Sequence, residues 1–147
     1  ILAGELARAA IPCTVVTNNL PAAMAAAASP CCTVHLLGGR LDADEQSTCG
    51  CECLAEVAAV YPDLCFLSVN ALDTEAGLTD FRLEEIPVMQ TILRTARQAA
   101  AVMDSTKIDR VAKRQGFAPS AMPPVIMDDG LRPEDRARYL AAGIRIL

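Results

Sequence analysis

Polar side chains and glycines follow several apolar runs of this sequence. These positions are Thr17–Asn19, Gly38–Gly39, Asn70, Asp104–Lys107 and Asp128–Asp129. Carboxylates and amides form hydrogen bonds with hydroxyl groups, whereas a lysine ammonium or the N–H groups of a helix N-terminus bind phosphate. Together, these residue types suit a small polyhydroxylated ligand that carries a phosphate.

Some of these positions also have a purely structural explanation. Asn18 and Asn19 suit a helix N-cap, and the pair Gly38–Gly39 suits a turn. Asp104 and Lys107 lie three residues apart after a strand, where an acid and a base have no need to pair structurally. Loops at strand ends often carry function, so a functional role is favoured there.

The stretch from Cys13 to Arg40 predicts a strand, a helix and a second strand. Residues 13–16 are short, apolar and β-branched, and Pro21 with the alanine run 22–28 favours a helix. Residues 33–37 form the second apolar run. A β-α-β unit has parallel strands and a right-handed crossover, so the polar turns after both strands are expected at one edge of the sheet.

The rest of the chain predicts further alternation of helices and strands. Helices are expected over residues 2–10, 51–60, 83–98, 108–114 and 133–142, and strands over residues 64–69, 99–103, 124–127 and 144–147. Loops are expected over residues 41–48 and 71–80. The continuous apolar run 64–69 favours a parallel strand covered on both faces. Glu84 and Glu85 suit the positive end of the helix that follows them.

Length and charge limit the possible functions. The chain has 147 residues, which suits one domain. Its net charge of -5 argues against nucleic-acid binding by this segment. No apolar run approaches the roughly 20 residues of a membrane helix, and no secretory signal is recognisable. The chain begins with Ile1 inside an amphipathic stretch, so we expect it to be a fragment of a larger protein.

The sequence has seven cysteines, an odd number, and several lie in apolar runs. This distribution predicts free thiols in a reducing compartment, which favours a cytoplasmic protein. Cys49, Cys51 and Cys53 form a C-x-C-x-C cluster that is tighter than the usual zinc spacing, and His35 is the single histidine. We therefore predict neither a metal site nor a cofactor.

An ordered set of motifs resembles the sensor domain of DeoR-family transcriptional regulators. The motifs are Thr14–Leu20, Leu36–Arg40, Phe66–Asn70, Gly77–Thr79, Asp104–Lys107 and the ending Arg132–Ile144. Any one of them is weak, whereas the ordered set spans nearly the whole chain and is fairly specific.

The resemblance implies an α/β fold with a Rossmann-like, mostly parallel sheet and flanking helices. This is the type found in ribose-5-phosphate isomerase, glucosamine-6-phosphate deaminase and CoA transferases. Residues 1–147 would be the sensor domain, and an N-terminal winged helix-turn-helix outside them would bind DNA, usually as a repressor of sugar catabolism. The sensor would bind a phosphorylated sugar or a related metabolite, and the protein would form a homo-oligomer.

The resemblance also implies a set of effector-binding residues. They are Asn18, Asn19, Gly38, Gly39, Asn70, Gly77, Thr79, Glu85, Asp104 and Lys107. Four features depart from the family. The stretch Cys49–Cys53 replaces what is usually a Gly-Pro turn. A phosphate loop of the Ser-Gly-Thr-Thr type would precede this chain, Met89 replaces a common lysine, and Pro87 is unusual in that helix. The effector therefore stays unidentified.

Two alternatives to a regulator's sensor domain remain open. An isomerase or deaminase acting on sugar phosphates would need a general base and an acid, for which Glu85, Asp104 and Asp128 are candidates. An oligomerisation module that has lost its ligand would also fit Met89 and a phosphate loop outside this chain. We predict the sensor domain, with no catalytic residue.

Overall fold

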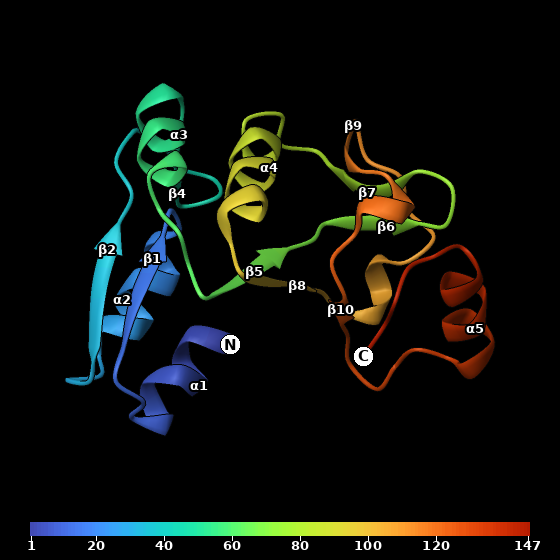
Figure 1. Ribbon diagram of the computed structural model, residues 1–147, viewed down its shortest axis with the longest axis horizontal. Coiled ribbons are helices and arrows are strands. Elements are labelled where there is room, and N and C mark those ends of the chain that lie inside the picture. Colours follow the sequence, from blue (N-terminus) through green and yellow to red (C-terminus); the bar gives the residue numbers. More distant parts are fainter. The chain divides into compact units, whose positions relative to one another are not determined.

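The β-α-β unit expected between Cys13 and Leu37 is present in the computed structural model, which describes residues 1–147. The chain divides into two compact units, Ile1–Ala59 and Val60–Leu147 (Figure 1). Five α-helices combine with parallel and antiparallel strand pairs. The fold is therefore mixed α/β, as predicted.

The first unit follows the predicted order as far as its second strand. Its elements are α1 (Leu2–Ala9), β1 (Cys13–Thr17), α2 (Leu20–Ala27), β2 (Cys32–Leu36), β3 (Arg40–Asp42), β4 (Ser47–Cys49) and α3 (Cys51–Ala58). The strands β1 and β2 pair in parallel, with Cys13 opposite Cys32. Helix α2 begins where predicted because Asn19 Oδ1 accepts the Ala22 N–H at 2.9 Å, and Pro21 lies in its first turn.

The loop predicted over residues 41–48 is wrong, because β3 and β4 form an antiparallel hairpin there. Asp42 Oδ1 accepts two backbone N–H groups of the turn at 3.1 and 3.2 Å, which closes it. Ser47–Cys49 are buried although two of them are polar. The burial is tolerated at Thr48 because its hydroxyl donates to the Leu37 carbonyl at 2.7 Å.

The second unit contains two three-stranded sheets and the remaining helices. Its elements are β5 (Leu64–Ser68), β6 (Ala71–Asp73), β7 (Gly77–Asp80), α4 (Glu85–Thr95), β8 (Gln98–Val102), the 3₁₀ helix η1 (Ser105–Lys107), β9 (Arg114–Phe117), the 3₁₀ helix η2 (Pro119–Ala121), β10 (Val125–Ile126) and α5 (Pro133–Ala141). Helices α4 and α5 lie inside the predicted ranges. The strand predicted over residues 144–147 is reduced to one parallel bridge, between Ile146 and Val125.

The strands β10, β8 and β5 form a parallel sheet in that order. Cys65 and Leu67 of β5 are buried, whereas Leu64 and Phe66 are 51% and 41% exposed. Our expectation that β5 is covered on both faces is therefore wrong. Alternate residues of a strand point to opposite faces, and only one face of β5 packs into the core.

The strands β6, β7 and β9 form a separate antiparallel sheet. The loop predicted over residues 71–80 and the basic helix predicted over residues 108–114 are therefore both wrong. Leu78 of β7 and Phe117 of β9 are buried and lie opposite each other, so this segment buries its apolar side chains through pairing between strands and not on the face of a helix. Gly116 lies within β9, where a Cβ would come within 2.8 Å of Leu78 Cδ2.

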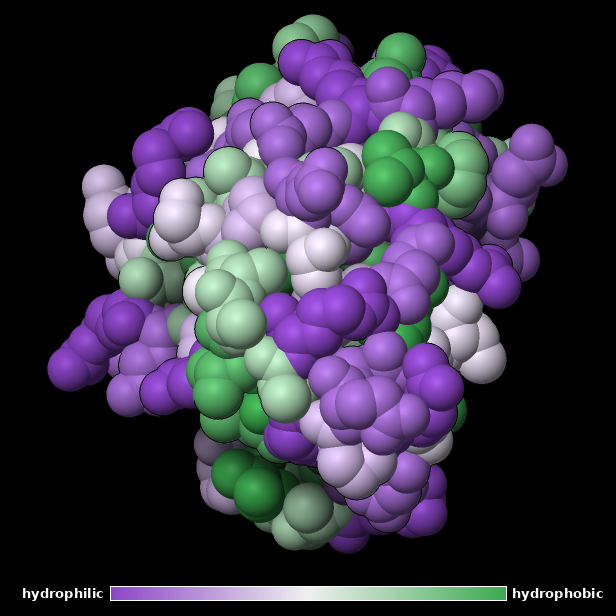
Figure 2. Space-filling view, turned by 90° about the vertical axis from the view of Figure 1, so that its right-hand side faces the viewer, coloured by the Kyte–Doolittle hydropathy of each residue, from purple (hydrophilic) through white to green (hydrophobic).

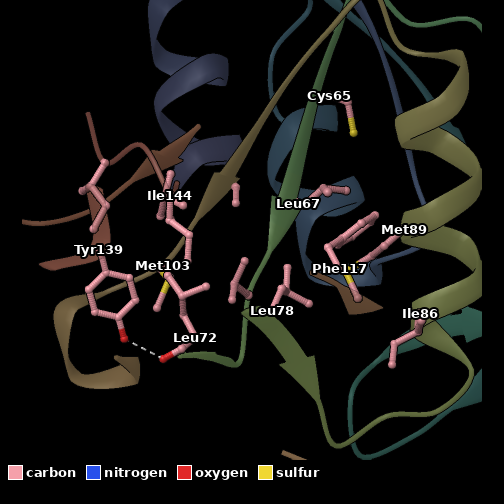
Figure 3. Packing of buried hydrophobic residues seen from close by; sticks show 14 residues of the cluster. Cys65, Leu67, Leu72, Leu78, Ile86, Met89, Met103, Phe117, Tyr139 and Ile144 are labelled. Carbon is pink, nitrogen blue, oxygen red and sulfur yellow. Dashed lines mark hydrogen bonds between the residues drawn. The ribbon is translucent and has the colours of Figure 1, made fainter. Parts of the chain in front are cut away.

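The hydrophobic core of the second unit gathers residues from both of its sheets and both of its α-helices. Ile86 and Met89 come from α4, and Leu72 and Leu78 come from the hairpin (Figure 3). Tyr139 of α5 is fully buried, and its hydroxyl donates to the Leu72 carbonyl at 2.9 Å. This hydrogen bond satisfies a polar group that burial would otherwise leave without a partner.

Charged side chains anchor α5 and cover its outer face. Asp135 is 6% exposed at its side chain and accepts hydrogen bonds from Arg138 Nη2 and Arg132 Nε, both at 2.8 Å. These bonds lower the pKa of Asp135. Figure 2 views the side on which α5 lies in Figure 1, and the surface there is mostly hydrophilic with smaller hydrophobic areas.

The lowered pKa of Asp135 predicts a loss of stability in acid. The ionised carboxylate contributes stability that is fully present above its unfolded pKa of about 3.9, and this contribution is lost as the pH falls through the lower folded pKa. We expect Asp135→Asn to lower the urea midpoint at neutral pH, and the gap to wild type to narrow as the pH falls below about 4. Urea unfolding at a series of pH values measures this gap. Asp44→Asn, an exposed control, should follow wild type throughout, and a gap for Asp135→Asn that is constant with pH would contradict the prediction.

Gly77 should tolerate no side chain. Its φ is +70°, and a Cβ there would lie 2.2 Å from the Phe117 carbonyl oxygen. Gly143 has a similar φ of +86° but open space around it. We expect Gly77→Ala to lower the free energy of unfolding by more than about 1 kcal/mol, and by more than Gly143→Ala does, because only Gly77 adds a steric clash to the unfavourable backbone conformation. Urea unfolding compares the two variants, and equal losses would argue against the clash.

Candidate functional site

In the first unit, the parallel pairing of β1 and β2 places the two predicted polar turns at the same edge. The Leu37 N–H donates to the Thr17 carbonyl at 2.9 Å, so the ends of the strands lie side by side. Asn18 Nδ2 donates to the Thr48 carbonyl at 3.0 Å, and the Thr48 N–H donates to the Asn18 carbonyl at 2.7 Å. Asn18 therefore ties the end of β1 to β4. Asn19 is the N-cap of α2, which supports the structural explanation for this residue.

Gly38 and Gly39 have distinct environments at the end of β2. The Gly38 N–H donates to Glu56 Oε2 at 2.7 Å, so this backbone amide already binds an anionic oxygen. Gly39 has a φ of +118°, and a Cβ there would lie 2.5 Å from the Cys49 carbonyl oxygen. The residue type at Gly39 therefore follows from packing, whereas the amide of Gly38 is chemically suited to an anion.

In the second unit, hydrogen bonds join the carboxyl ends of the three parallel strands. Lys107 Nζ, which follows β8, donates to the Val69 carbonyl after β5 at 3.1 Å. The Ser105 N–H donates to Asp128 Oδ1, after β10, at 2.9 Å. Lys107 Nζ also lies 3.6 Å from Asp104 Oδ2. The predicted group Asp104–Lys107 thus lies at the sheet edge where open α/β sheets bind ligands.

The charges of this group are set by local contacts. A hydrogen bond from the Thr106 hydroxyl and the nearby Lys107 ammonium lower the pKa of Asp104, so its carboxyl is ionised at neutral pH. The side chains of Asp104 and Lys107 are 45% and 29% exposed. A carboxylate and an ammonium are therefore both within reach of a ligand in solvent.

Asn70 and Glu85 are linked through two residues that the sequence did not single out. Asn70 Nδ2 donates to Asp80 Oδ2 at 3.0 Å, and Arg82 Nε donates to Asp80 Oδ1 at 3.2 Å. Arg82 Nη1 lies 3.9 Å from Glu85 Oε1. Asp80 is fully buried at the end of β7. Asp80 and Arg82 are an acid and a base two residues apart, and this spacing is the sequence signal that could have identified them as an ion pair. Their link to Asn70 depends on tertiary structure and has no such signal.

Gly77 and Thr79 have structural contacts that explain their residue types. Gly77 permits the close approach of the Phe117 carbonyl described above. Thr79 is 2% exposed, and its hydroxyl accepts the Ala112 N–H at 2.7 Å. These two residues fix the β6–β7 hairpin and the segment before β9.

The predicted residues therefore fall into two groups. Asn18, Asn19, Gly38 and Gly39 belong to the first unit, and Asn70, Gly77, Thr79, Glu85, Asp104 and Lys107 belong to the second. Each group gathers around the carboxyl ends of parallel strands or the hairpin next to them. No group of three or more histidine, cysteine or acidic side chains is arranged to hold a metal ion.

None of the helices is both long enough and apolar enough to span a membrane.

Comparison with known proteins identifies the family. The family model described as the DeoR C terminal sensor domain matches residues 1–129. The HTH-type transcriptional regulator GolR of Listeria innocua is 23% identical over 133 residues, which cover 90% of this chain and 52% of that protein. The putative aga operon transcriptional repressor of Escherichia coli O157:H7 is 23% identical over 131 residues, covering 89% of this chain and 49% of that protein.

The deoxyribose operon repressor of Escherichia coli K12 is 29% identical over 101 residues, which cover 69% of this chain and 40% of that repressor. The chain thus spans about half the length, or less, of these curated relatives. Because the family model matches most of its residues, the chain belongs to the family of DeoR C-terminal sensor domains.

Proposed function

We propose that this chain is the effector-binding domain of a DNA-binding transcriptional regulator and that its effector is a phosphorylated sugar or a related metabolite. The match of the sensor-domain family to residues 1–129 carries this proposal. The relatives named above are a transcriptional regulator and two repressors, which favours a sensing role over catalysis.

The chemistry at the strand ends suits such an effector. In the second unit, the Lys107 ammonium would bind phosphate, and the Asp104 carboxylate would accept hydrogen bonds from sugar hydroxyls. The first unit presents a separate group, in which an anionic oxygen of an effector would bind the Gly38 N–H by displacing the Glu56 carboxylate, and the Asn18 side chain would form a hydrogen bond with a hydroxyl. Asn19, Asn70 and Glu85 would border these groups.

We further propose the Rossmann-like type of fold found in ribose-5-phosphate isomerase and its relatives. The parallel pairs β1–β2 and β5–β8–β10 and the polar residues at their carboxyl ends support this type. We propose binding without turnover, because the relatives are named as regulators and the acidic candidate Glu85 lies beside the guanidinium of Arg82.

The whole protein would couple this domain to DNA. A winged helix-turn-helix would precede the chain, and a phosphate loop would lie between the two. The net charge of -5 supports a division in which another segment contacts DNA. An effector changes operator affinity only by its differential affinity for the DNA-competent and DNA-incompetent states, and a homo-oligomer would share that equilibrium.

Lys107 provides the sharpest test of the proposed phosphate subsite. In the full-length protein, an effector at about 100 times its dissociation constant should add roughly 2.7 kcal/mol to stability, a shift of several degrees in Tm. We expect Lys107→Met to weaken binding of that sugar phosphate at least about tenfold, because it removes the ammonium that pairs with phosphate. A thermal-shift screen of sugar phosphates followed by isothermal titration calorimetry measures both effects.

Lys113→Met is the matched control, because Lys113 is exposed and lies outside the predicted site. It should bind the effector as wild type does. Lys107 also holds the Val69 carbonyl, so Lys107→Arg serves as a second variant that keeps the charge and should bind better than Lys107→Met. Consumption of the ligand would instead support an isomerase or deaminase, and the absence of binding across the panel would contradict the proposal.

A further inference from the structure

Two cysteine thiols face each other across the parallel strands of the first unit. Cys13 of β1 lies directly opposite Cys32 of β2, and their Sγ atoms are 3.7 Å apart. Neighbouring strands lie about 4.8 Å apart, which is within the Cα separation of disulfides. Both cysteines are free and half-buried. A small rotation of the two side chains would therefore bring the sulfur atoms into bonding distance without a change in backbone register.

The surroundings distinguish this pair from other thiols of the chain. Cys49 Sγ donates to the Arg40 carbonyl at 3.4 Å, and Cys51 Sγ donates to Glu52 Oε2 at 3.2 Å, so these two thiols contact oxygen atoms. Cys65 is buried, and this burial raises the pKa of its thiol to about 11. Burial and the neighbouring Cys32 also raise the pKa of Cys13, so the contact between the two sulfur atoms, and not thiol acidity, distinguishes this pair.

We propose that Cys13 and Cys32 form a site of reversible oxidation, which closes to an intramolecular disulfide on reaction with a low-molecular-weight disulfide such as oxidised glutathione. One protein thiol loses its proton and attacks the small disulfide, which gives a mixed disulfide and releases one small thiol. The second protein thiol loses its proton and attacks the mixed disulfide at the protein sulfur, which releases the second small thiol. Two electrons pass from the protein thiols to the small disulfide, and the two protons leave with the released thiols.

The position of the pair explains what closure would change. Cys13 and Cys32 lie at the amino ends of their strands, whereas the polar turns Thr17–Asn19 and Gly38–Gly39 lie at the carboxyl ends. The bond would enclose α2 in a covalent loop and restrict the unfolded chain, which stabilises the folded unit. A pair that is free in the folded state fits a reversible redox site better than a permanent structural bridge.

Oxidation of the chain with excess oxidised glutathione tests the site. Wild type should lose two thiols in addition to those that gain glutathione in its intact mass, and its Tm should rise by several degrees and return after dithiothreitol. Peptide mapping should recover Cys13 linked to the peptide that contains Cys32. Cys13→Ser and Cys32→Ser should show no such link and no rise in Tm.

Cys31→Ser is the matched control, because Cys31 is also half-buried and adjoins Cys32 in sequence. This variant should still form the disulfide with Cys13, which identifies Cys32 and not Cys31 as the partner. The proposal is overturned if Cys31→Ser abolishes the link, if mapping recovers a different pair, if glutathione remains attached to Cys13 or Cys32 as a mixed disulfide, or if wild type does not react. Mapping on wild type gives this answer even if a serine variant fails to fold.

Discussion

Parallel pairing is the constraint on which the proposed site depends. Strands that pair in parallel run in the same direction, so their carboxyl ends meet at one edge. In the first unit this brings Thr17–Asn19 beside Gly38–Gly39. In the second unit it brings Asp104–Lys107 into hydrogen-bonding contact with the residues that follow β5 and β10. A slip of one residue in either pairing would turn every side chain to the other face of its sheet and disperse these groups.

Burial of Tyr139 connects the core of the second unit to this edge. Its hydroxyl donates to the Leu72 carbonyl at 2.9 Å and accepts the Asp109 N–H at 2.9 Å. Burial raises the pKa of Tyr139 to about 12, so the hydroxyl remains a hydrogen-bond donor at neutral pH. Asp109 follows Lys107 by two residues and also pairs with Arg138 at 2.7 Å. The segment that carries Lys107 is therefore anchored from α5, and the position of its ammonium depends on packing far from it in sequence.

Local signals predicted most of the regular elements of the fold. Two helix starts are displayed by the sequence because their signals act within a single turn. They are the asparagine cap and first-turn proline of α2, and the proline and acidic residues at the start of α5. The hairpins β3–β4 and β6–β7 were missed because strands of three or four residues are too short to show alternation. The basic helix expected over residues 108–114 is wrong at its end, because Arg114 begins the strand β9, which pairs with β7. In the site, Asp104 and Lys107 could be predicted from the sequence because they come directly after the strand β8. The buried Asp80 and its partner Arg82 could not be predicted as site residues, because only the folded chain brings Asn70 to them.

The central claim is that the effector binds at the carboxyl ends of the parallel strands. Amide NMR spectra of the isotopically labelled full-length protein, titrated with a sugar phosphate that binds it, test this claim most directly. The account predicts that the largest chemical-shift changes fall on the amides of residues 104–107, which follow β8 in the second unit, with small changes along the exposed face of α5. Large changes confined to α5, with residues 104–107 unaffected, would contradict it.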